Sequence, residues 1–144
     1  MAVRIFFQET KITLSDRARL KLFIEQLFKK EKKDLADLNY IFCSDKVLLD
    51  MNRQFLKHDY YTDIITFNFS DSTESVEGEI YISVDRIREN ARNLGITIKE
   101  ELHRVIFHGA LHLCGYKDKL PRDKKKMTRA EDKYLGIYLF KRST

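Results

Sequence analysis

The chain contains few of the residues that interrupt or cross-link a fold. Its 144 residues include one proline, five glycines, two cysteines and no tryptophan. This composition excludes a collagen-like repeat, and the chain shows no Pro/Gly/Ser-rich linker. The two cysteines, Cys43 and Cys114, form no framework of spaced pairs, so we expect two free thiols in a reducing cytoplasm.

Long apolar runs are absent as well. No segment approaches the roughly 20 residues that cross a bilayer, and the N-terminus lacks the apolar centre of a signal peptide. We therefore expect a cytoplasmic protein with no membrane partner. Hydrophobic residues make up 43% of the chain and charged residues 34%, which excludes a disordered chain. The length predicts one domain over residues 1–144.

Positive charge is concentrated near the C-terminus. The formal net charge is +5, while residues 117–144 alone carry ten basic and four acidic side chains. A basic segment of this kind attracts polyanions such as RNA. The alternative, which by itself is the commoner case, is a solvated helix face.

Apolar periodicity and capping residues predict a mixed sheet of about four strands with helices mainly on one face, an α/β (α+β) domain. Ser44, Ser83 and Thr97 are expected helix N-caps, and Thr97 with Glu100 has the spacing of a capping box. Gly95 and Gly115 are expected to end helices. The predicted strands are 3–8, 38–43, 63–69 and 79–84, and the predicted helices are 15–33, 44–56, 83–95, 97–114 and 121–140.

The most informative segment is residues 107–119, FHGALHLCGYKDK. His108 and His112 are four apart on a predicted helix, so their imidazoles lie on one face, one turn apart. Gly115 can adopt a positive φ and reverse the chain, which would bring the Asp118 carboxylate to the same point. The spacing H-x-x-x-H-x-x-G-x-x-D matches the metzincin metal motif with aspartate as third ligand. Three protein ligands leave a fourth position for water, as in catalytic zinc sites.

One expected residue is missing from this motif. Metalloproteases of the class carry glutamate directly after the first histidine as a general base, and here that position is Gly109. A peptidase mechanism therefore lacks its proton acceptor, whereas metal-assisted hydrolysis of another bond remains possible. A glycine there also lets backbone or a bulky substrate approach the helix closely.

The remaining histidines and Cys114 fit no metal site. His103 lies about 140° around the helix from His108 and is expected at the surface or hydrogen-bonded in place. His58 lies in a loop. Cys114, on the opposite side of the helix from His112, is expected to pack in the core.

The segment 108–116 closely resembles the signature of the YbeY-type endoribonucleases, the bacterial rRNA maturation factors. Asn52 and the segments 62–67 and 78–83 resemble further motifs of that family, and the resemblance extends from about residue 41 to 138. It implies a small α/β fold related to zincin-like metal hydrolases, with one bound zinc. It also implies a cytoplasmic role in maturing the 3′ end of small-subunit rRNA and in ribosome quality control, with the small subunit or assembly factors as partners.

Two positions depart from the family pattern. Asp118 replaces the third histidine; a carboxylate is also a good zinc ligand, although it makes the ion less positive. Leu56 stands where the family tends to carry an arginine, a residue suited to holding phosphate. We hypothesise that Lys57 or His58 takes over this contact.

The sequence thus predicts a zinc-dependent endoribonuclease acting on single-stranded RNA, with His108, His112 and Asp118 as ligands. Asp63 is a candidate general acid or base, with capping of a helix or turn as its alternative role. Arg104, one turn before His108, is a candidate phosphate contact, or a surface partner of Glu100. Further candidate RNA contacts, or otherwise a solvated helix end, are Lys124, Lys125 and Lys126.

Two other functions are consistent with the sequence. A non-catalytic, zinc-stabilised RNA-binding assembly factor would fill the fourth coordination position with protein, and Cys43 is the spare soft ligand. A metallopeptidase or amidase is disfavoured by Gly109. The hypothesis that the C-terminal helix binds a membrane surface has the least support, because the apolar residues at 134–140 predict packing on the core.

Overall fold

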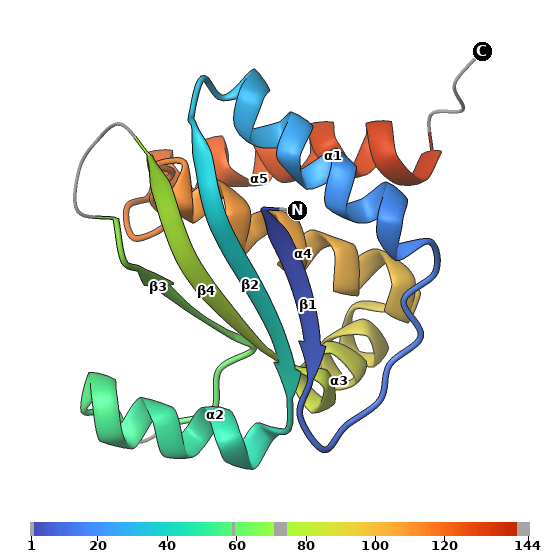
Figure 1. Cartoon of the computed structure of the whole chain (residues 1–144). Helices are drawn as coiled ribbons and strands as arrows, with labels where there is room; N and C mark the ends of the chain where they lie inside the picture. The colour runs from blue at the N-terminus through green and yellow to red at the C-terminus, as the bar shows by residue number, and fades with distance from the viewer. Residues whose placement is uncertain (1, 59, 71–74, 141–144) are drawn as a thin grey trace.

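A computed structural model describes residues 2–58, 60–70 and 75–140 of the chain (Figure 1). The order and type of the elements agree with the prediction. Along the chain they are β1 (Val3–Phe7), α1 (Arg17–Lys30), β2 (Leu35–Cys43), α2 (Asp45–Met51) with a π-helical turn (Asn52–Leu56), β3 (Ile64–Asn68), β4 (Val76–Ser83), α3 (Val84–Leu94), α4 (Ile98–Leu113) and α5 (Pro121–Leu135) with a second π-helical turn (Gly136–Phe140).

Several boundaries differ from the predicted ones. Strands β2 and β4 each begin three residues earlier than expected, because the two pair with each other over almost their whole length, polar residues included. Helix α1 begins two residues later than predicted. Its N-cap is Asp16, which has a φ of 50° and accepts a hydrogen bond from Arg19 N. The expected caps Ser44, Ser83 and Thr97 are confirmed by their side-chain bonds to the helix N-termini.

The sheet is mixed, as predicted, with strand order β1-β2-β4-β3. The pairs β1–β2 and β2–β4 are parallel, whereas β3 runs antiparallel to β4 and forms one edge. Four helices, α1, α3, α4 and α5, cover one face, and α2 lies against the other (Figure 1). No helix in the described part of the chain is both long and apolar enough to cross a membrane.

Two glycines, Gly109 in α4 and Gly78 in β4, let helix α4 lie close to the sheet. A Cβ at Gly109 would lie 2.9 Å from Ile80 Cδ1 and 3.0 Å from Ile64 Cδ1. A Cβ at Gly78 would lie 2.9 Å from Leu113 Cδ1. The close approach expected at Gly109 is therefore observed, but the sheet makes it and a substrate does not, because this face of the helix is buried against β3 and β4.

The C-terminal segment packs on the core as predicted, with Tyr134, Leu135 and Tyr138 buried. Of the two positions expected for His103, the surface one is wrong, because the residue is 2% exposed and lies beside Phe107 and Tyr138, whereas the hydrogen-bonded one agrees with the structure. Its Nδ1 is hydrogen-bonded to Lys99 O at 2.7 Å, while Nε2 has no partner within the described residues. Burial lowers the pKa of His103 below its ordinary value.

Both cysteines are buried free thiols, as expected. Cys114 belongs to the main core, which confirms its predicted role in packing. Cys43 lies on the opposite face of the sheet, in the small cluster under α2, and its thiol is hydrogen-bonded to Ile82 O at 3.6 Å.

Candidate metal centre

Helix α4 and the turn that follows it position the three candidate ligands. The helix starts at Thr97, whose hydroxyl accepts from Glu100 N at 3.0 Å. After the helix, Gly115 adopts a φ of 106°, a conformation that side chains disfavour, and the chain turns back. The hydrogen bond from Tyr116 N to Leu111 O, 3.0 Å long, holds this reversal. Asp118 is thereby brought under the helix.

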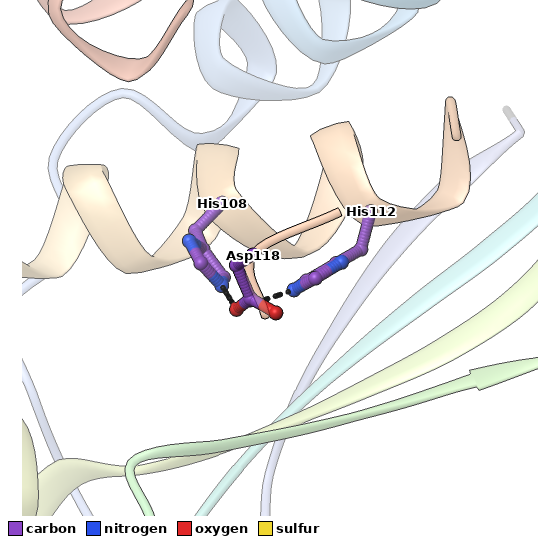
Figure 2. Close-up of side chains that lie close together, drawn as sticks. All are labelled: His108, His112 and Asp118. Atoms are coloured by element: carbon purple, nitrogen blue, oxygen red, sulfur yellow. Dashed lines mark hydrogen bonds and ion pairs between the residues drawn. The ribbon is translucent and has the colours of Figure 1, made fainter. Parts of the chain in front are cut away.

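The side chains of His108, His112 and Asp118 converge. Asp118 Oδ2 lies 3.3 Å from His108 Nε2 and 3.1 Å from His112 Nε2, and Figure 2 shows both rings directed at this carboxylate. Within the described residues these three form the one group able to hold a metal ion, with their ligand atoms within 4.8 Å of one another. Zinc ligands at 2.0–2.1 Å in tetrahedral geometry lie about 3.3 Å apart, so the spacing fits such an ion.

The other nitrogen of each imidazole is also held. His108 Nδ1 lies 2.6 Å from Glu131 Oε2, and His112 Nδ1 lies 2.9 Å from Tyr116 O. A ring that donates from Nδ1 keeps the lone pair of Nε2 free for a cation, and such outer contacts fix ring orientation in metal sites. The sequence hypothesis missed Glu131. The signal available was an acidic residue on the buried stripe of α5, between Met127 and Tyr134.

Glu131 also joins Arg104 to the site. Arg104 Nη1 lies 3.0 Å from Glu131 Oε1, and Nη2 lies 2.8 Å from Asp132 Oδ1. The expected surface pair with Glu100 is therefore wrong, because packing of α4 on α5 directs the guanidinium at α5. Burial lowers the pKa of His108, but the Glu131 hydrogen bond and nearby carboxylates outweigh it and raise the pKa above its ordinary value.

The three residues lie in the wall of a cleft with a volume of about 810 Å³. Helix α4 forms one side, and strand β3 with residues 52–58 and 60–63 forms the other. Of the other candidate residues, Asp63, Arg104 and His58 line the cleft. Lys119, which the sequence hypothesis did not include, also lines it.

The remaining candidate RNA contacts lie outside this lining. Lys57 is exposed next to the cleft, at the end of the π-helical turn. The three exposed lysines of the first turns of α5 lie further along the surface, and one of them lines a separate cavity of about 460 Å³ beside the 114–117 turn. They are Lys124, Lys125 and Lys126.

Asp63 and Glu101 form a second acidic pair in the cleft. One amide nitrogen, Asn90 Nδ2, lies 3.3 Å from Asp63 Oδ2 and 3.3 Å from Glu101 Oε2. The Asp63 side chain thus contacts α3. Burial raises the pKa of both carboxyl groups above their ordinary values. Both groups therefore hold a proton more readily than exposed carboxylates do.

Leu56 lies at the cleft, 41% exposed, in the place where the sequence pattern led us to expect arginine. His58 follows it, and its Nδ1 is hydrogen-bonded to Tyr60 OH at 2.9 Å with the two rings stacked at 20°. The imidazole of His58 is thus already oriented in the lining of the cleft.

Known proteins similar to this chain agree on one family. A family model described as Endoribonuclease YbeY matches residues 4–138. A curated Endoribonuclease YbeY from Cytophaga hutchinsonii is 50% identical over 138 residues, which cover 94% of this chain and 96% of the relative. Its counterpart from Parabacteroides distasonis is 39% identical over 137 residues, covering 95% and 96%.

A solved structure has the same fold. The solution structure of TM1509 from Thermotoga maritima is 32% identical to this chain, with a TM-score of 0.65. The match covers 93% of this chain and 87% of that protein. Sequence and fold therefore agree over nearly the whole length.

Proposed function

The chain belongs to the endoribonuclease YbeY family, and on that premise we propose that it is a zinc-dependent endoribonuclease that hydrolyses phosphodiester bonds in ribosomal RNA. The observation that carries the proposal is the convergence of two imidazole nitrogens and one carboxylate oxygen in the wall of the cleft. Their spacing suits one small cation per chain. The cleft gives an extended polymer room to reach it.

The donor set fits zinc. His108, His112 and Asp118 would hold the ion, with Glu131 and Tyr116 O fixing the rings from behind. When bound, such an ion supplies Lewis-acid polarisation of a phosphate oxygen and acidifies a water molecule to a pKa of about 7. Within the described residues the group has three ligand side chains, and Cys43 is buried on the other face of the sheet. This favours a hydrolytic site over a closed structural one.

Proton transfer is assigned to Asp63. Its Oδ2 accepts from Asn90, which leaves Oδ1 to hold a proton or pass it to the leaving oxygen. Burial keeps part of this group protonated nearer neutral pH than an ordinary aspartate, as a general acid requires.

Phosphate positioning is assigned to basic groups in and around the cleft. Arg104 is fixed by Glu131 and Asp132 and has further N–H donors to offer a phosphate oxygen. His58 and Lys119 line the same cleft and would contact neighbouring phosphates. Lys57 and the exposed lysines Lys124, Lys125 and Lys126 would attract the polyanion from further away, so affinity should fall steeply with salt.

The proposed substrate is a single-stranded segment of rRNA at the 3′ end of the small-subunit RNA. The proposed setting is ribosome maturation and quality control in the cytoplasm, with the small subunit or its assembly factors as partners. The proposal follows the family membership and the cleft chemistry together.

The direct test measures bound metal and RNA cleavage on the same preparations. His112→Ala and Asp118→Ala should each lose zinc and lose cleavage of a single-stranded rRNA fragment, while Asp50→Ala, an exposed carboxylate on α2, should keep both. Cleavage that survives loss of the metal would refute the proposed chemistry. Metal bound by the wild type without any cleavage would favour a non-catalytic, RNA-binding assembly factor.

A further inference from the structure

We propose that the outer edge of the sheet beside the cleft is a stacking surface for unpaired RNA bases, made by Phe55, Phe67 and Phe69. These three residues are called the aromatic edge below. The inference rests on the proposed function, because it names the part of the chain that would read the single-stranded character of the substrate.

The rings of the aromatic edge are exposed although they contact one another. Phe55 is 57% exposed and Phe69 is 51% exposed, while Phe67 between them is partly buried. The rings of Phe67 and Phe69 are parallel within 3°, with centroids 6.0 Å apart. Phe55 meets Phe67 edge-on at 6.3 Å. Phenylalanine is usually buried, so a connected group of half-exposed rings points to a binding surface.

This surface is continuous with the cleft. Along β3 the side chains alternate, so that Thr66 and Asn68 line the cleft while Phe67 and Phe69 lie on the other face of the sheet. Phe55 directly precedes Leu56, another cleft residue. Since β3 is an edge strand (Figure 1), a chain leaving the cleft crosses one strand to reach the rings.

The main chain of β3 adds donors for phosphate. The bonds from Ser83 N to Asp63 O and from Phe69 N to Glu77 O show that odd-numbered residues pair with β4. The N–H groups of Thr66 and Asn68 therefore point outward from the free edge of the sheet. Two residues of a strand span about 6.8 Å, so the donors repeat along the direction in which we expect the RNA to run.

Single-stranded RNA suits this combination better than a protein partner does. Every base has a flat π-face that stacks on aromatic rings, and single-stranded RNA is commonly bound by such platforms next to backbone donors. The chain belongs to a family of endoribonucleases, so RNA has to reach the cleft beside these rings, and the exposed Lys57 lies two residues after Phe55.

The test separates binding from cleavage. In an Asp118→Ala background, which should not cleave, Phe69→Ala and Phe55→Ala should weaken binding of a short fluorescein-labelled single-stranded RNA by about 5- to 150-fold each, the equivalent of about 1–3 kcal/mol. Phe69→Trp should retain binding, whereas Phe69→Leu should not. The matched control is Phe6→Ala, a 48% exposed phenylalanine on β1 at the opposite edge of the sheet, which should bind as the parent does.

The same substitutions in the active protein should raise KM for single-stranded RNA and leave kcat nearly unchanged. The same RNA annealed to its complement should bind all variants equally. Single-stranded binding by Phe69→Ala equal to that of Phe6→Ala would overturn the inference while leaving the nuclease proposal intact. Binding of single-stranded RNA by Phe69→Leu as tight as that of the parent would also overturn the inference, in favour of a protein partner. Stacking-dependent binding in a wild type that never cleaves RNA would support the inference and refute the nuclease.

Discussion

Replacing Glu131 with glutamine isolates the residue that tertiary packing adds to the candidate metal centre. Glu131 is 6% exposed, and its two oxygens accept from His108 Nδ1 at 2.6 Å and from Arg104 Nη1 at 3.0 Å. Glutamine keeps the shape but has one oxygen. If that oxygen remains on the guanidinium, the amide NH₂ faces His108 and favours the tautomer protonated on Nε2, the nitrogen assigned to the metal.

The expected cost is large enough to measure. Loss of such an outer contact weakens metal affinity by about 10- to 100-fold, or about 1.4–2.7 kcal/mol. Because a ligand that binds only the folded state stabilises it by mass action, the stabilisation conferred by excess zinc should fall by the same amount. We expect Glu131→Gln to fold but to bind zinc with that loss of affinity.

The assay is a competition titration against a zinc chelator at fixed pH, paired with thermal unfolding with and without zinc. The matched control is Asp132→Asn, which alters the other carboxylate on Arg104, 60% exposed, and contacts neither imidazole. Zinc affinity in this control should equal that of the wild type. An unchanged affinity in Glu131→Gln, or an equal loss in Asp132→Asn, would refute the reasoning.

Three further predictions concern stability. Gly109→Ala should lower the free energy of unfolding by about 1–2 kcal/mol in denaturant titrations despite better helix propensity, because its Cβ meets Ile80; Gly136→Ala, with nothing within 4 Å, should not destabilise. The pKa of Asp63 in the folded protein lies above 3.8, so its ionisation costs the folded state stability as pH rises through that pKa. Asp63→Asn removes this cost and should raise the free energy of unfolding at neutral pH, with no increase below pH 3.8. The pKa of His103 in the folded protein lies below 6.5, so the unfolded chain takes up this proton at a higher pH than the folded protein does. Stability therefore falls as pH drops from 6.5 through the folded pKa. His103→Leu should make that decline shallower in urea titrations from about pH 7 to 5.

Local sequence determined the parts of the molecule that depend on neighbours along the chain. The rise and twist of an α-helix are fixed, so a spacing of four was sufficient to place His108 and His112 on one face. A glycine at position 115 permits the positive φ of the turn, and the caps Ser44, Ser83 and Thr97 fix helix starts through bonds spanning three residues. These features need no knowledge of distant residues, which explains why their prediction succeeded.

Only the tertiary structure decided which distant groups meet. The packing of α4 between the sheet and α5 has three consequences. Glu131 contacts His108, Arg104 contacts α5 and not Glu100, and His103 is buried. Strand order is likewise non-local, and it places β3 at the edge, with the exposed Phe69 directly after it. Many partners satisfy the same local pattern, and the choice among them is made by burial and close packing of segments far apart in sequence.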